Sequence, residues 1–137
     1  MTLALALRLV GASHVVLGVA HIPMWRWFGW TKELRRLEPL TARVFAVHTF
    51  FIAFVLVALG ILAALRPELL LDKSDLARLL CGTGVVFWGL RLLAQPLVFD
   101  PVLLRGSRYR TPLRAAAVIG FAFYTGVYAW ALLGQLN

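Results

Sequence analysis

Four apolar segments, each long enough to cross a lipid bilayer, take up most of this chain. They run over residues 3–25, 44–65, 76–98 and 112–136. A helix rises ~1.5 Å per residue, so about 20 residues span a hydrocarbon core of ~30 Å. The sequence is also 61% hydrophobic, whereas soluble domains are only about half apolar. These features predict an all-α membrane protein, a four-transmembrane-helix bundle with short loops that forms a single integral membrane domain over residues 1–137.

The basic residues are concentrated in alternate loops. Residues 26–43 contain five basic and two acidic side chains, and residues 100–114 contain four basic and one acidic side chain. The middle loop, residues 66–78, has three of each. Because basic loops face the cytoplasm, we expect a multi-pass protein of the bacterial inner membrane with both termini on the outer, periplasmic side. This topology accounts for the net charge of +8 without a nucleic-acid partner.

Helix start and stop signals flank the apolar segments. Thr41 is a candidate N-cap for the second helix, and Pro67 is placed to end it. Ser74 or Asp75 can cap the third helix, while Thr111 followed by Pro112 is a typical start for the fourth.

Residues 31–40 have an amphipathic pattern. Leu34, Leu37 and Leu40 recur at intervals of three, and the basic residues lie largely off that stripe. This spacing favours a short helix lying on the inner membrane surface. A basic loop without helical structure is the alternative interpretation.

Several polar residues interrupt the apolar segments. Residues three, four or seven positions apart share one face of a helix. Gly11, His14, Gly18 and His21 therefore form one stripe on the first helix, and Gly84, Trp88, Arg91 and Gln95 form another on the third. His48 lies near the start of the second helix.

Polar side chains in a membrane usually face the protein interior. We therefore predict a polar site in the cytoplasmic half of the bundle, formed by His21, His48, Arg91 and Gln95, with His14 and Trp88 nearby. No acidic residue lies well inside a segment, so Arg91 needs a counter-charge from elsewhere. A bound anion, a cofactor carboxylate, a lipid head group or Asp100 would each supply one.

Histidines in membrane helices can ligate haem iron or other transition metals. His21 and His48 are the candidate ligands for a b-type haem or a metal ion, with Arg91 available to a haem propionate. His14 and His21 are two turns apart, roughly 10 Å along the helix axis, so one metal ion cannot easily bind both. The alternative interpretation is structural: the glycines permit close packing of helices and His14 bonds within the protein.

Three functions follow from these residues. The first is binding of a cofactor or small ligand, by the chain alone, as a homo-oligomer or as a subunit of a larger membrane complex. The second is a membrane enzyme that binds a lipid, a quinone or an isoprenoid, and the third is a purely structural accessory subunit. The sequence carries neither the membrane carboxylate of proton-coupled exporters nor the carboxylates of di-iron bundles. No Ser-His-Asp arrangement indicates a hydrolase.

Overall fold

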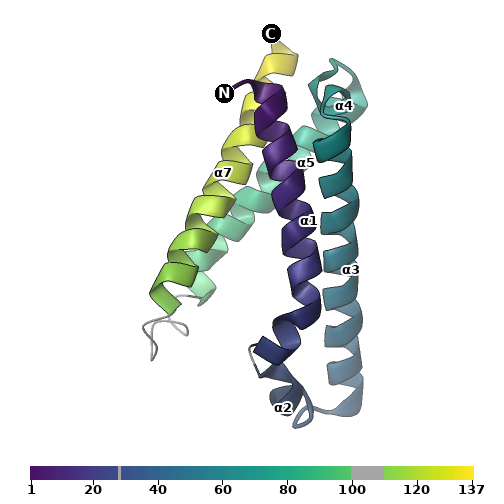
Figure 1. Ribbon diagram of the computed structural model, residues 1–137, viewed down its shortest axis with the longest axis vertical. Coiled ribbons are helices and arrows are strands. Elements are labelled where there is room, and N and C mark those ends of the chain that lie inside the picture. The colour runs from purple at the N-terminus through teal and green to yellow at the C-terminus, as the bar shows by residue number, and fades with distance from the viewer. Residues whose placement is uncertain (28, 100–109) are drawn as a thin grey trace. The chain divides into compact units, whose positions relative to one another are not determined.

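The computed structural model describes residues 1–27, 29–99 and 110–137, and this part of the chain is helical with no strand (Figure 1). Its elements, in chain order, are α1 (Leu3–Trp27), α2 (Trp30–Leu34), α3 (Pro39–Leu65), α4 (Glu68–Leu71), α5 (Asp75–Ala94), η1 (Gln95–Phe99) and α7 (Arg110–Leu136).

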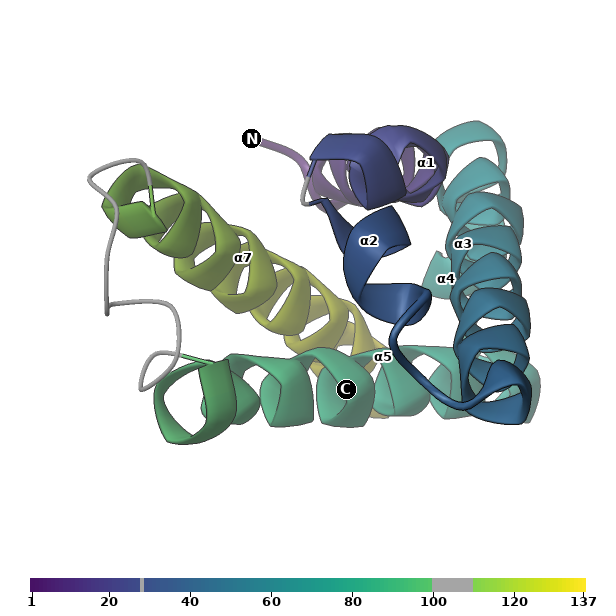
Figure 2. The same cartoon turned by 90° about the horizontal axis from the view of Figure 1, so that it is seen from below.

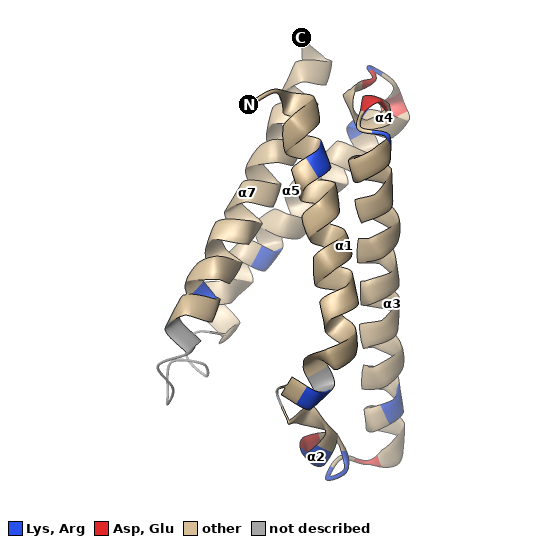
Figure 3. Cartoon of the chain, viewed as in Figure 1, with Lys and Arg blue, Asp and Glu red and all other residues tan. Residues whose placement is uncertain are grey.

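Four of these helical segments are long and apolar enough to cross a membrane. They are Leu3–Met24, Pro39–Leu65, Asp75–Phe99 and Pro112–Leu136, with mean hydropathies between 1.5 and 2.5. Figure 3 shows that the middle of α3 carries no charged residue, whereas basic residues lie near both of its ends. The described residues thus confirm the predicted all-α fold and the presence of four helices that are long and apolar enough to span a membrane.

The chain divides into two compact units. The first comprises residues 1–7 and 68–137, and therefore contains α4, α5, η1 and α7. The second comprises residues 8–67, and therefore contains most of α1 together with α2 and α3.

Glycines bring α1 and α3 into close contact in the second unit. A Cβ atom added to Gly11 would lie 2.5 Å from the Gly60 carbonyl oxygen, and one added to Gly18 would lie 2.9 Å from that of Ala53. Neither distance leaves room for a side chain, so the helix backbones approach closely. These pairs also make the helices antiparallel, and Figures 1 and 2 show them side by side. Gly11 and Gly18, which were predicted to permit close approach, therefore pack against the backbone of α3.

The start of α3 differs from the prediction. Pro39 occupies the first turn, and the Glu38 side chain accepts a hydrogen bond from the Thr41 backbone N–H at 3.1 Å. The predicted Thr41 N-cap is therefore wrong, because proline is pre-organised for the first helical position and moves the start of the helix ahead of Thr41. The helix begins at residue 39 rather than near 44.

The surface helix predicted over residues 31–40 is also shorter than expected. Helix α2 covers only Trp30–Leu34, and Glu38 has the extended ψ of 138°. A residue that precedes proline is disfavoured in the α conformation, so Pro39 separates α2 from α3. The predicted middle loop contains the short helix α4, which was not predicted.

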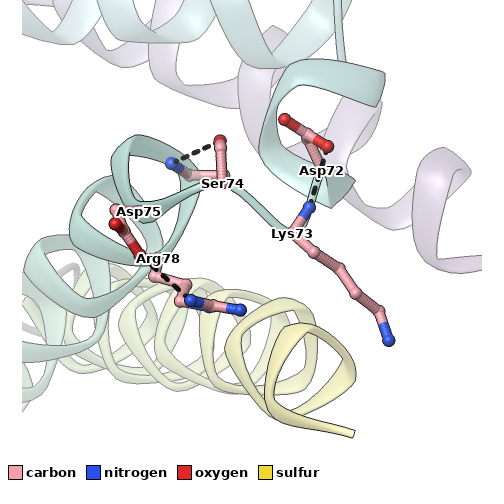
Figure 4. A network of polar contacts seen from close by, with 6 residues as sticks. Asp72, Lys73, Ser74, Asp75 and Arg78 are labelled. Atoms are coloured by element: carbon pink, nitrogen blue, oxygen red, sulfur yellow. Dashed lines mark hydrogen bonds and ion pairs between the residues drawn. The ribbon is translucent and has the colours of Figure 1, made fainter.

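Helix α5 begins at a well-formed cap. Ser74 accepts a hydrogen bond from the Ala77 backbone N–H at 3.3 Å, which confirms Ser74 as one of the two predicted caps. Asp75 accepts a hydrogen bond from Arg78 at 3.0 Å, and the Asp72 side chain accepts one from the Lys73 backbone N–H (Figure 4). Asp75 also lies in the first turn, where a negative charge is favourable.

Aromatic side chains fill the contact between α5 and α7. Trp88 stacks on Phe121 with a centroid distance of 5.5 Å and contacts Tyr124 at 4.6 Å. One turn before Trp88, the Tyr128 ring covers Gly84, where an added Cβ would lie 2.7 Å from the ring. These contacts hold α5 and α7 together in the first unit.

The end of α5 widens into the π-helical turn η1. Pro96 has no backbone N–H to donate to the Leu92 carbonyl oxygen, which accepts instead from the Gln95 N–H. Turns of this kind within helices are frequent at functional sites. This turn lies next to Arg91, one of the predicted site residues.

Candidate functional site

Arg91 is held between two aromatic rings in the first unit. Its guanidinium carbon lies 4.3 Å from the ring centroid of Phe99 in η1 and 4.7 Å from that of Phe121 in α7. Both distances fall within the ~6 Å range of cation–π attraction. The Nη1 atom of Arg91 is buried and has no hydrogen-bond partner among the described residues. The two rings therefore attract the guanidinium cation, while the N–H groups of Nη1 donate no hydrogen bond within the described residues.

No acidic side chain in the described residues of the four segments that could span a membrane neutralises Arg91. Asp75 is the only acid in these four segments, and it pairs with Arg78 at 3.0 Å. Asp75 also precedes Arg91 by 16 residues, which is about 24 Å along a helix. Asp100, the loop acid considered as a counter-charge, lies outside the described residues.

Trp88 and Gln95 accompany Arg91 on α5 and η1. Both are buried, with exposed fractions of 5% and 3%. Trp88 stacks on Phe121, and the Phe121 ring also contacts Arg91. The predicted stripe of Trp88, Arg91 and Gln95 thus combines a cation, an amide and several aromatic rings within one unit.

The histidines lie in the second unit. His14 is buried, with 2% of its surface exposed, and its Cβ lies at the contact between α1 and Gly60. The side chain therefore emerges where two helix backbones pack closely. The structural interpretation of His14 stays a prediction.

His21 has a defined ring orientation. Its Nδ1 lies 2.7 Å from the Leu17 carbonyl oxygen. A carbonyl oxygen only accepts, so this contact requires the hydrogen on Nδ1 and leaves the lone pair of the neutral ring on Nε2. Metal-ligating histidines are often oriented by this type of bond. His21 is half-buried and keeps one nitrogen available for a ligand.

His48 is exposed and lies in a shallow groove on α3. Arg43, Val44, Val47, His48 and Phe51 line this groove. Ala53 faces α1, and His48 precedes it by five residues, a rotation of about 140° around the helix. The structure therefore places His48 away from the α1 side of α3, which disfavours one ligand bound by His21 and His48 of the same chain.

Trp88, Arg91 and Gln95 belong to the first unit, and the three histidines belong to the second. The prediction that one site uses both sets of residues stays a prediction. Within the described residues, no group of three or more His, Cys, Asp or Glu side chains could hold a metal ion.

A buried polar cluster in the first unit was not predicted. The Gln135 Nε2 atom donates to the Leu70 carbonyl oxygen at 2.6 Å, and the Cys81 thiol donates to the same oxygen at 3.5 Å. Gln135 is 2% exposed, and its Oε1 atom has no hydrogen-bond partner in the part of the chain described. Gln135 and Leu70 are 65 residues apart, so no local pattern could have indicated this contact.

Comparison with protein-family models, curated protein sequences and solved structures found no match for this chain. The class of the protein is defined by its fold: the described residues contain four helices that are long and apolar enough to span a membrane. One of those helices carries an arginine flanked by aromatic rings.

Proposed function

We propose that this chain is a non-enzymatic, multi-pass protein of the bacterial inner membrane that binds an amphiphilic small ligand or cofactor through an anionic group at Arg91. The supporting observation is the guanidinium between Phe99 and Phe121, with no acidic partner among the described residues of the four segments. An unpaired cation in a membrane is costly. A carboxylate or phosphate would neutralise it and accept charge-assisted hydrogen bonds from Nη1.

The neighbouring residues suit such a ligand. Gln95 is buried about one helical turn after Arg91. Trp88 and Phe121 offer apolar surface for the rest of an amphiphile. Because Nη1 is buried, a ligand can reach it only after a local opening of the structure. The π-helical turn that carries Phe99 is the segment that we propose moves aside. With the proposed cytoplasmic position of the basic loops, Arg91 lies in the inner half of the membrane.

Matched single-chain amphiphiles test this proposal. The protein in a neutral maltoside detergent is titrated with laurate, dodecyl phosphate and uncharged dodecanol, and the thermal unfolding midpoint is followed. We expect saturable stabilisation by the two anions only. Arg91→Gln abolishes the response, Arg91→Lys weakens it because an ammonium lacks the planar fork of guanidinium, and the control Arg66→Gln retains it. An equal response to dodecanol, or an undiminished response in Arg91→Gln, contradicts the proposal.

A second candidate function is ligation of a b-type haem or a transition metal by His21. The supporting observation is the bond from Nδ1 to the Leu17 carbonyl oxygen, which leaves Nε2 available. An absorption spectrum and metal analysis of protein purified in mild detergent test it. A Soret band or bound metal that is lost in His21→Ala, and kept in His14→Ala, supports ligation; the same measurement on His48→Ala tests that residue as a second ligand. A colourless, metal-free protein overturns it.

If both experiments fail, the accessory-subunit function becomes the favoured one. Other membrane subunits that co-purify with the protein would then support it.

A further inference from the structure

The second unit has a strongly basic end around α2 and the start of α3. The basic residues there are Arg26, Lys32, Arg35, Arg36 and Arg43. Its two acids are already engaged: Glu33 pairs with Arg36 at 3.3 Å, and Glu38 caps α3. Among the described residues, Lys32, Arg35 and Arg43 have no acidic partner. This end therefore has unneutralised positive charge available for an anion.

The groove on α3 lies at this basic end. Arg43 and His48 flank it on opposite sides, because five residues separate them, a rotation of about 140°. Val44, Val47 and Phe51 lie between them and form an apolar surface. Arg43 is the fifth residue of α3, and His48 lies about 7.5 Å further along the helix axis. Polar groups therefore flank an apolar strip near the start of a helix that is long and apolar enough to span a membrane.

An aromatic contact holds the surface segment beside this groove. Trp30 of α2 packs edge-on against Phe45 of α3, with ring centroids 5.6 Å apart. This contact places Lys32, two residues after Trp30, at the same end of the unit as Arg43. Figure 3 shows basic residues gathered at this end, on α2 and on the lower part of α3.

We propose that this face of α3 binds one anionic phospholipid. Arg43 pairs with the phosphate, His48 donates a hydrogen bond to a phosphate or ester oxygen, and an acyl chain lies over Val44, Val47 and Phe51. Lys32 and Arg35 add attraction to the head group. The ligand is a lipid rather than a free anion because the groove is mostly apolar and belongs to a membrane-spanning helix. This inference uses none of the residues of the Arg91 site and stands independently of it.

Native mass spectrometry of the protein in a neutral detergent tests the site. The protein is titrated with phosphatidylglycerol and with phosphatidylcholine of the same acyl chains. We expect the first phosphatidylglycerol molecule to bind more tightly than the first phosphatidylcholine molecule. Arg43→Ala weakens that binding about fivefold, and the double variant Arg43→Ala/His48→Ala weakens it further. Equal binding of the two lipids, or unchanged phosphatidylglycerol binding in the double variant, overturns the proposal.

Matched variants separate this site from general charge effects and from the Arg91 site. Arg66→Ala removes an arginine from the other end of α3 and leaves the phosphatidylglycerol preference intact. Arg91→Gln also leaves it intact, so failure of one proposal does not imply failure of the other. Arg43→Glu reverses the charge at an exposed position and abolishes the preference without disturbing a packing contact. Displacement of the lipid by millimolar inorganic phosphate overturns the choice of a phospholipid as the ligand.

Discussion

Gly11 and Gly60 meet backbone to backbone where α1 packs on α3. A Cβ at position 60 would lie 2.8 Å from the Gly11 carbonyl oxygen, and a Cβ at position 11 would lie 2.5 Å from the Gly60 carbonyl oxygen. Backbone atoms cannot move aside as a flexible side chain can, so a methyl group at either position must separate the helices.

Gly60→Ala is therefore expected to destabilise the protein by about 1–3 kcal/mol, the usual cost of overpacking. Gly82→Ala is the matched control, because nothing lies within 4 Å of a Cβ at that position, and alanine is the better helix former. The measurement is the thermal unfolding midpoint in detergent. Equal midpoints for the two variants would show that α1 and α3 do not pack through these glycines.

Gln135→Leu is expected to destabilise the first unit. The variant introduces an apolar side chain of similar size and removes the 2.6 Å hydrogen bond to the Leu70 carbonyl oxygen. Loss of one partner from a buried polar group costs about 1–3 kcal/mol. Cys81→Ala removes the longer contact to the same oxygen, so a smaller loss is expected. If Cys81→Ala proves the more damaging variant in thermal unfolding, the assigned strengths of these two bonds are wrong.

The apolar segments predicted the spanning helices because length and hydropathy are local properties of the chain. Ser74 was predictable as a cap for the same reason, since its bond partner is three residues away. Thr41 was misassigned because the neighbouring Pro39 and Glu38 form the stronger start signal. The stripe that contains Trp88, Arg91 and Gln95 could be identified from helical spacing alone.

Contacts between distant segments could not be predicted in the same way. Phe121 contacts Arg91 from 30 positions further along the chain, and nothing in either segment selects that ring over Phe123. The orientation of His48 also depends on which face of α3 packs against α1. Gly60 and Ala53 lie on that face. Spacing identifies the residues that share a helix face, but packing decides what that face contacts.

Energetic coupling between Arg91 and Phe99 is expected from the 4.3 Å contact of the guanidinium with the ring. A double-mutant cycle with Arg91→Met and Phe99→Leu isolates this contact, and we expect a coupling energy of about 0.5–2 kcal/mol in the unfolding free energy. Phe87 provides the control, because it is 51% exposed and contacts Trp88 instead. Coupling of Arg91 to Phe87 as strong as its coupling to Phe99 would argue against a specific cation–π contact.

The proposed orientation in the membrane places the C-terminus outside the cytoplasm. Residues 26–43 carry five basic and two acidic side chains, whereas residues 66–78 carry three of each, so the positive-inside rule assigns the first loop to the cytoplasm. Helices that cross the membrane alternately then bring Asn137 to the outer side. Alkaline phosphatase fused after Asn137 is expected to be active, and green fluorescent protein at the same position is expected to stay dark. The same reporters fused after Glu38 should give the opposite result, which controls for expression. A fluorescent C-terminal fusion would reverse the topology and would move Arg91 to the outer half of the membrane.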